Sequence, residues 1–99
     1  MEEPAQAKLV SLRLRIEGLV QGVGYRAFAA AEARKLRLDG WVRNRSDGTV
    51  EAQVYGETAD VESFVQACLR GPSGAKVTNI DLRNCEPLEE KGFRQRPTL

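Results

Sequence analysis

Residues 8–36 read KLVSLRLRIEGLVQGVGYRAFAAAEARKL, and this stretch decides the predicted fold because its pattern changes twice. It begins with strict alternation between an apolar and a polar face, formed by Val10, Leu12, Leu14 and Ile16 and by Ser11, Arg13, Arg15 and Glu17. This alternation predicts a half-buried strand from Lys8 to Gly18. Residues 18–24 then hold three glycines, which predict a shaped loop, because glycine adopts positive φ and allows close backbone approach. From Tyr25 to about Leu36, high alanine content predicts a helix.

The chain continues with a hairpin, a second helix and further strands. Two β-prone runs, Trp41 to Arg45 and Thr49 to Tyr55, are joined by Ser46-Asp47-Gly48, and an Asp-Gly pair between such runs favours a hairpin. Apolar residues then recur at helical spacing, from an expected N-cap at Thr58 to a stop at Gly71-Pro72. A later strand is indicated by Val77, Ile80 and Leu82, although the alternation of apolar and polar residues shifts between Val77 and Ile80. Phe93 to Arg96 suit a short edge strand.

This order of elements predicts an α+β fold. Strand, helix, strand, strand, helix, strand makes a ferredoxin-like βαββαβ two-layer sandwich, in which both helices cover one face of an antiparallel sheet. A chain of 99 residues builds one core, so we expect a single domain over residues 8–99, preceded by a flexible polar leader over residues 1–7.

Composition excludes several classes of function. The chain has no histidine, which removes the commonest general base and the commonest zinc ligand together. Cys68 and Cys85 are too few for a disulfide framework and form no C-x-x-C pair, so we expect two reduced thiols. The net charge of +1 provides no global field to attract nucleic acid or an anionic membrane.

Two places in the sequence invite a chemical interpretation. A glycine-rich loop between a strand and a helix directs backbone N–H groups and the positive end of the helix dipole at one point, where Arg26 would add a guanidinium fork. The alternative is a tight turn beside a solvated Arg26, and the physics of the loop leaves both open.

Asn44 lies in a β-prone run where asparagine is disfavoured, so it is either a harmless edge residue or an amide that holds a water. Trp41 and Tyr25 are expected to serve packing.

Two segments stand out together, GLVQGVGYRAF at residues 18–28 and GWVRNRSDGTVE at residues 40–51. In this order they closely resemble both signature segments of the acylphosphatase family. The resemblance runs from about Leu9 through Leu82 and implies the ferredoxin-like fold predicted above. One residue departs from it near the end of the chain, because Gln95 stands where such proteins usually carry an aliphatic residue.

The resemblance implies an acylphosphatase that cleaves a carboxylic–phosphoric mixed anhydride to a carboxylate and inorganic phosphate, without metal, cofactor or covalent enzyme intermediate. Carried over by position, it gives two catalytic residues, Arg26 and Asn44. Arg26 and the amides of residues 22–26 would bind the phosphoryl group, and Asn44 would orient the attacking water. The implied phosphate-binding loop consists of Gln21, Gly22, Val23, Gly24, Tyr25 and Arg26.

Other readings of the same residues are weaker. The spacing Gly22-x-Gly24-x-x-Ala27 also fits a dinucleotide fingerprint, but that motif belongs to a parallel β-α-β unit of a larger sheet. A cysteine phosphatase needs an arginine six residues after its nucleophile, and neither cysteine has one. The main rivals are non-catalytic: a module that binds phosphate or acyl phosphate without turnover, or a sheet that binds RNA with Arg43 and Arg45 on its phosphates.

The expected partner is a small-molecule acyl phosphate. An RNA-binding sheet would carry several aromatic residues, and that signature is absent, so we expect no nucleic-acid partner. No apolar run is long enough to cross a bilayer, and residues 1–7 lack the basic and apolar regions of a secretory signal. We therefore expect a cytoplasmic monomer without a membrane partner.

Overall fold

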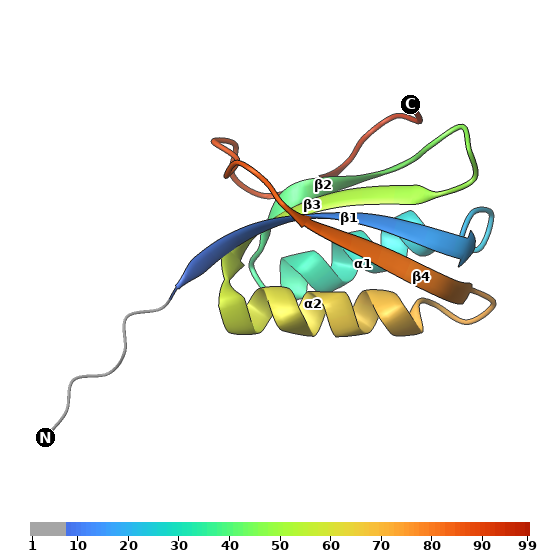
Figure 1. Ribbon diagram of the computed structural model, residues 1–99, viewed down its shortest axis with the longest axis horizontal. Coiled ribbons are helices and arrows are strands. Elements are labelled where there is room, and N and C mark those ends of the chain that lie inside the picture. Colours follow the sequence, from blue (N-terminus) through green and yellow to red (C-terminus); the bar gives the residue numbers. More distant parts are fainter. Residues whose placement is uncertain (1–7) are drawn as a thin grey trace, which may run out of the picture.

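The computed structural model describes residues 8–99, so the predicted leader at residues 1–7 lies outside the described residues. The elements follow the predicted order, with a fifth strand at the end: β1 (Leu9–Leu19), α1 (Tyr25–Lys35), β2 (Asp39–Asn44), β3 (Val50–Glu57), α2 (Thr58–Arg70), β4 (Lys76–Asn84) and β5 (Phe93–Gln95). Figure 1 shows two layers, with α1 and α2 side by side on one face of the sheet. The predicted two-layer α+β fold is confirmed.

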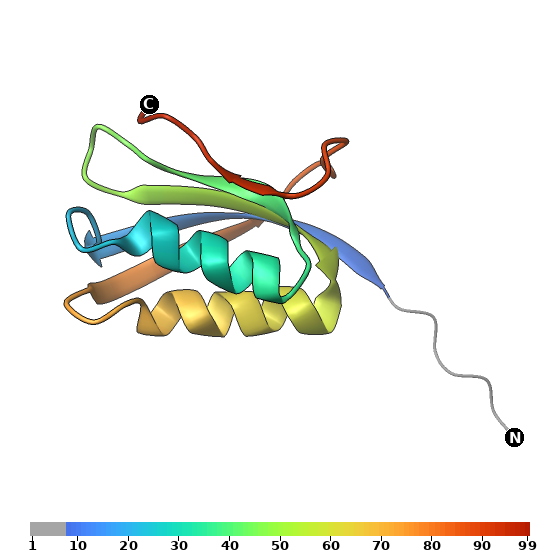
Figure 2. The ribbon, with the colours of Figure 1, turned by 180° about the vertical axis from the view of Figure 1, so that it is seen from behind.

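The sheet has the strand order β4-β1-β3-β2-β5. β1 pairs antiparallel with both β3 and β4, and β2 and β3 form the predicted hairpin. The short strand β5 lies parallel to β2, so the sheet is not antiparallel throughout. Seen from behind in Figure 2, the segment after β4 crosses to the opposite edge of the sheet and turns back, so β5 runs opposite to β4 and parallel to β2.

A bulge explains the loss of phase that the sequence shows in β4. Glu17 pairs with Asn79, but the next residue, Gly18, pairs with Val77, so Thr78 is an extra residue in β4. Gly18 adopts a φ of 125°, and a Cβ there would collide with the backbone of Lys76. The bulge therefore needs glycine, and it lets Val77 and Ile80 both pack against the core.

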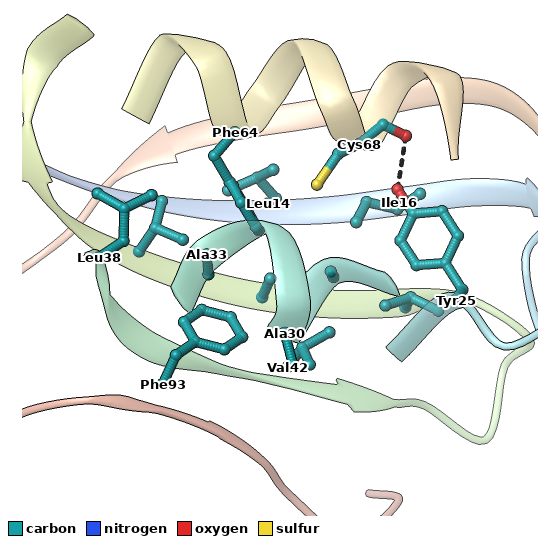
Figure 3. Packing of buried hydrophobic residues seen from close by; sticks show 14 of the residues in the cluster. Leu14, Ile16, Tyr25, Ala30, Ala33, Leu38, Val42, Phe64, Cys68 and Phe93 are labelled. Atoms are coloured by element: carbon teal, nitrogen blue, oxygen red, sulfur yellow. Dashed lines mark hydrogen bonds between the residues drawn. The ribbon is translucent and has the colours of Figure 1, made fainter. Parts of the chain in front are cut away.

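The core fills the space between the sheet and the two helices, as Figure 3 shows for Leu14, Ile16 and Phe64. Tyr25, the first residue of α1, is only 2% exposed, and its hydroxyl donates a 2.6 Å hydrogen bond to the Cys68 carbonyl of α2. In an α-helix that carbonyl would accept from residue 72, but residue 72 is proline and has no N–H. The Tyr25 hydroxyl therefore supplies the donor that Pro72 lacks.

The other face of the sheet carries arginines around Trp41, which is only 3% exposed. The guanidinium carbons of Arg43, Arg96 and Arg13 lie 4.7, 4.8 and 5.3 Å from the ring centroid of Trp41. Trp41 thus serves packing, as predicted, but it packs beneath cations on the open face and not in the main core.

Candidate active site

The site is built where the loop after β1 enters α1. Gly22 and Gly24 adopt φ values of 75° and 78°, and apart from their neighbours in the chain no residue lies within 4 Å of where their Cβ atoms would stand. The demand for glycine here is therefore conformational and not steric. Gly24 is the N-cap of α1, and no side chain caps this helix. The turn leaves the positive end of α1 open at the protein surface.

Backbone donors are available at this end of α1. The hydrogen bond from the Phe28 N–H to the Gly24 carbonyl opens the helical ladder, at 3.1 Å. The amides of residues 25–27 precede it and have no acceptor inside the helix. Arg26 projects from the same turn, is half-buried, and makes no side-chain hydrogen bond or ion pair within residues 8–99. Free amides and a free guanidinium together form a site for an anion.

Gln21 fixes the loop against the β2–β3 hairpin. Its Nε2 donates to the Arg45 carbonyl at 2.8 Å and to the Thr49 carbonyl at 2.9 Å. The Arg45 N–H in turn donates to Thr49 at 2.9 Å. These bonds join the loop to the segment that follows Asn44, so the distance between the two signature segments is set by Gln21.

Asn44 is the last residue of β2, which resolves the conflict between asparagine and strand propensity, because the strand ends there. It lies two residues beyond the fully buried Val42 and therefore faces the helix side of the sheet. Within residues 8–99 its side-chain amide has no hydrogen-bond partner. Its backbone carbonyl accepts a 3.1 Å hydrogen bond from the Leu99 N–H.

The two predicted catalytic residues line one pocket. This pocket, of about 170 Å³, is bounded by Val20, Gly22, Gly24, Tyr25, Arg26, Ala27, Asn44 and Gln95. Four of the six predicted loop residues are therefore on its wall. The other two are not: Gln21 bonds to the hairpin, and the Val23 side chain packs against the core. Sequence reasoning noticed Gln95 as a departure but did not place it at this pocket.

The residues on either side of Asn44 are held by one carboxylate. Glu51 Oε1 on β3 accepts from Arg43 Nε at 2.8 Å and from Arg45 Nη1 at 3.1 Å. Burial by itself would raise the pKa of Glu51, but these hydrogen bonds and the two positive charges outweigh it and hold the pKa below its usual value. Glu51 is therefore an anion at neutral pH that braces the strand on both sides of Asn44.

A larger pocket, of about 290 Å³, lies on the open face of the sheet, with the lining Arg13, Arg15, Arg45, Glu51, Asp81 and Arg83. Its guanidinium groups already have carboxylate partners, such as Asp47 for Arg15 at 2.8 Å. They are therefore less available to a new anion than Arg26. The smaller pocket is the better candidate for chemistry.

No group of three or more His, Cys, Asp and Glu side chains in residues 8–99 could hold a metal ion. No described helix has the length and apolar character needed to cross a membrane.

Both cysteines are unpaired, as the sequence predicts. Cys68 lies in the core, where burial raises the pKa of its thiol to about 12. Cys85 is half-buried beside Ser11, with 3.3 Å between Sγ and Oγ. Neither lines the candidate pocket.

Comparison with known proteins identifies the family. The acylphosphatase family model matches residues 12–95, which include every residue on the wall of the pocket. An acylphosphatase of Acidiphilium cryptum is 48% identical over 90 residues, which are 91% of this chain and 99% of that protein. One from Azoarcus sp. is 46% identical over 98 residues, 99% of each chain.

A solved structure agrees with these relatives in fold. The crystal structure of acylphosphatase from Bacillus subtilis superposes with a TM-score of 0.84 at 40% identity, over 90% of this chain and 99% of that one. Since the family model and full-length relatives coincide with the predicted signature segments, the chain belongs to the acylphosphatase family, the enzymes that hydrolyse acyl phosphates.

Proposed function

We propose that this acylphosphatase works by positioning and electrostatic stabilisation, with Arg26 and the loop amides on the phosphoryl group and Asn44 on the attacking water. The observation that supports this is the shared pocket: free amides at the start of α1, an unpaired Arg26 and an unpaired Asn44 amide all lie on its wall.

The phosphoryl group is proposed to occupy the open end of α1. In phosphoryl transfer the negative charge lies largely on the equatorial oxygens, and fixed donors around those oxygens stabilise it without reorganising. The amides of residues 22–26 and the fork of Arg26 are such donors. The loop is held in place by Gln21, so its donors are in position before the substrate arrives.

The proposed role of Asn44 is to orient the water for in-line attack on phosphorus. The water oxygen forms the new P–O bond while the bond from phosphorus to the acyl oxygen breaks, and the electron pair leaves with the carboxylate. One water proton passes to another phosphate oxygen, and the other stays on the attacking oxygen. A carboxylate has a pKa of about 4 and needs no proton to leave, so the reaction requires no side-chain base.

The test of this assignment is a pair of alanine variants with matched controls. Arg26→Ala and Asn44→Ala should each abolish measurable hydrolysis of acetyl phosphate, since removing one such donor typically costs about 10²- to 10³-fold in rate. Lys35→Ala, at the exposed far end of α1, and Asn84→Ala, at the end of β4, should keep wild-type rates. Circular dichroism checks that each variant is folded.

Two results would count against the assignment. Folded Arg26→Ala or Asn44→Ala protein with wild-type turnover would remove that residue from the mechanism. Wild-type protein that binds acetyl phosphate but releases no phosphate would favour a binding module without turnover.

We further propose that the reaction needs no metal. The described residues offer no cluster of metal ligands, and the mechanism assigns charge stabilisation to Arg26 and backbone amides. Extensive treatment with EDTA should leave the rate of hydrolysis within about twofold of the untreated enzyme, because catalysis by positioned donors persists without a cation. Strong inhibition that added Mg²⁺ or Zn²⁺ reverses would contradict this.

Residues 8–99 are proposed to form one domain that acts as a cytoplasmic monomer. The two unpaired cysteines suit a reducing compartment. The open sheet face offers no stacking platform at Trp41, which lies beneath three guanidinium groups, and this supports the absence of a nucleic-acid partner. Sedimentation of the pure protein should give the monomer mass of 11.0 kDa.

A further inference from the structure

Gln95 brings a second amide side chain to the pocket. β5 pairs in parallel with β2, so that Phe93 lies opposite Gly40 and Gln95 opposite Val42. Phe93 and Val42 are both buried on the helix side of the sheet, and side chains two residues apart share a face. Gln95 therefore faces the same side as Asn44, from the neighbouring strand.

The backbone fixes the two strands relative to each other beyond the end of β5. The Arg96 N–H donates to the Val42 carbonyl at 2.8 Å, and the Leu99 N–H donates to the Asn44 carbonyl at 3.1 Å. The Ser46 N–H then donates back to the Leu99 carbonyl at 2.9 Å. Residues 96–99 thus run along β2 and hold the strand that carries Asn44 beside the one that carries Gln95.

Neither amide is used by the protein itself. Within residues 8–99 the side chains of Asn44 and Gln95 make no hydrogen bond, although both line the pocket. The strand pattern would favour an apolar residue after Phe93 on this face, and the chain has an exposed glutamine there. An amide that no protein group satisfies, on the wall of a small pocket, is available to water or to a substrate.

We propose that Gln95 is a second water-holding residue, which contacts the same attacking water as Asn44. Both amides reach the pocket from adjacent strands on the same side of the sheet. One amide oxygen can accept a proton of the water while an amide N–H donates to one of its lone pairs, so the other lone pair is aimed at phosphorus. This inference rests on the proposed role of Asn44 and adds a second contact to that water.

The test replaces the amide while keeping the size of the side chain. Gln95→Met should lower kcat about three- to tenfold, the range expected for one neutral hydrogen bond, with KM within about twofold of wild type. Gln95→Val, which restores the apolar alternation of the strand, should show the same loss. The loss should be equal for acetyl, propionyl and benzoyl phosphate, because the water is common to all three reactions.

Arg94→Met is the matched control, since Arg94 is the neighbouring residue of β5 and pairs across from Trp41 on the open face. It should keep both kcat and KM within about twofold of wild type. A merely structural effect of Gln95 would alter the melting temperature, which we expect to stay unchanged because the side chain is exposed.

Four outcomes would overturn the proposal. An unchanged kcat in both Gln95 variants would remove the contact with the water. A loss that differs between acyl groups would place Gln95 against the leaving group, and a raised KM at constant kcat would place it on the phosphoryl group. If wild-type enzyme turns over none of the three substrates, the proposed function fails, and this inference fails with it.

Discussion

Tyr25 shows how a single side chain links the core to the candidate site. Its backbone begins α1 on the wall of the pocket, while its hydroxyl reaches the Cys68 carbonyl in the core, as Figure 3 shows. Burial raises the pKa of the phenol far above its usual value, so the hydroxyl remains a donor at every working pH. A Cβ at Gly71, the C-cap of α2, would come within 3.2 Å of the ring, which favours glycine where Tyr25 lies against the end of this helix.

Removing only this hydroxyl should destabilise the protein. Tyr25→Phe keeps the ring but leaves the Cys68 carbonyl buried without a donor, because Pro72 cannot supply one. We expect the free energy of unfolding to fall by about 1–3 kcal/mol, measured by urea denaturation. Tyr55→Phe, on the open face, makes a control that should change stability by less than about 0.5 kcal/mol. Equal stability of Tyr25→Phe and wild type would show that water replaces the lost donor.

Among individual residues, the family resemblance of the sequence predicted Arg26 and Asn44 at the site, whereas their local patterns left both open, and the structure brings both to one pocket. It could not predict the position of Gln95, because the parallel pairing of β5 with β2 depends on where the chain returns after β4 and not on any local pattern. The sequence nevertheless carried a signal for Gln95, because this polar residue stands in a strand position where the alternation predicts an apolar residue facing the core. The hydrogen bond between Tyr25 and Cys68 could not be predicted from the sequence either, because it joins residues 43 positions apart.

At the level of elements, the β2–β3 hairpin is the support for Asn44. Its turn is closed by Asp47, which accepts from the Thr49 N–H at 3.0 Å and from Thr49 Oγ1 at 2.6 Å. Its strands are joined on the open face by Glu51, which lies opposite Arg43 in the register. The Glu51 carboxylate on β3 therefore links the charged groups of the open face to β2, the strand that carries Asn44.

Glu51 should make the stability of the hairpin depend on pH. Its folded-state pKa lies below the usual 4.5, so its contribution is fully present above that pH and is lost as the pH falls through the folded-state value. Glu51→Gln should lower the free energy of unfolding by about 1–2 kcal/mol at neutral pH, a modest value because the arginines are partly exposed. The difference should shrink at acid pH, as protonation leaves the wild-type side chain uncharged too.

The comparison is made by urea denaturation of both proteins at the two pH values. Glu62→Gln, on the exposed side of α2, gives the background effect of removing a carboxylate. If the Glu51→Gln variant stays less stable than wild type by the same amount at acid pH, the shape of the Glu51 side chain, and not its charge, accounts for its contribution to the free energy of unfolding.

The order and type of the elements were predictable because long periodic patterns dominate them. The first and last residues of the elements were less predictable. Thr58 was expected to be the N-cap of α2 but is its first helical residue, and its hydroxyl donates to the Lys8 carbonyl. The helical spacing of apolar residues would put Leu69 on the buried face of α2, yet it is 46% exposed. The bulge at Thr78 arises from pairing between distant strands, so the sequence could show only its trace, the phase slip in β4.

For the whole molecule, the sheet joins residues that are far apart in sequence into one core. The inner strand β1 pairs with β3 and β4, and both helices lie over the same buried cluster. Charge is distributed unevenly around this core: arginines collect on the open face, whereas the candidate site draws its positive potential from Arg26 and a helix terminus. The net charge of +1 predicts neither the arginine-rich open face nor the positive potential at the candidate site.

A single core predicts a single unfolding transition. Heat or urea should unfold the protein in one cooperative step, with coincident curves from circular dichroism and from calorimetry, because no described element has a core of its own. The heat-capacity change should be about 1.1–1.4 kcal/mol/K for a domain of this size. Two separate transitions would contradict the single-domain proposal for residues 8–99.

The segment that follows β5 has a consequence for how the enzyme is made. A ribosome adds residues 93–99 after every other part of the sheet, and these residues supply the backbone partner of Asn44 and the amide of Gln95. A nascent chain that stops after β4 already has its loop, its hairpin and both helices. On the proposed mechanism it would bind phosphate with its loop, and turnover would reach its full rate only when this last segment has emerged and docked along β2.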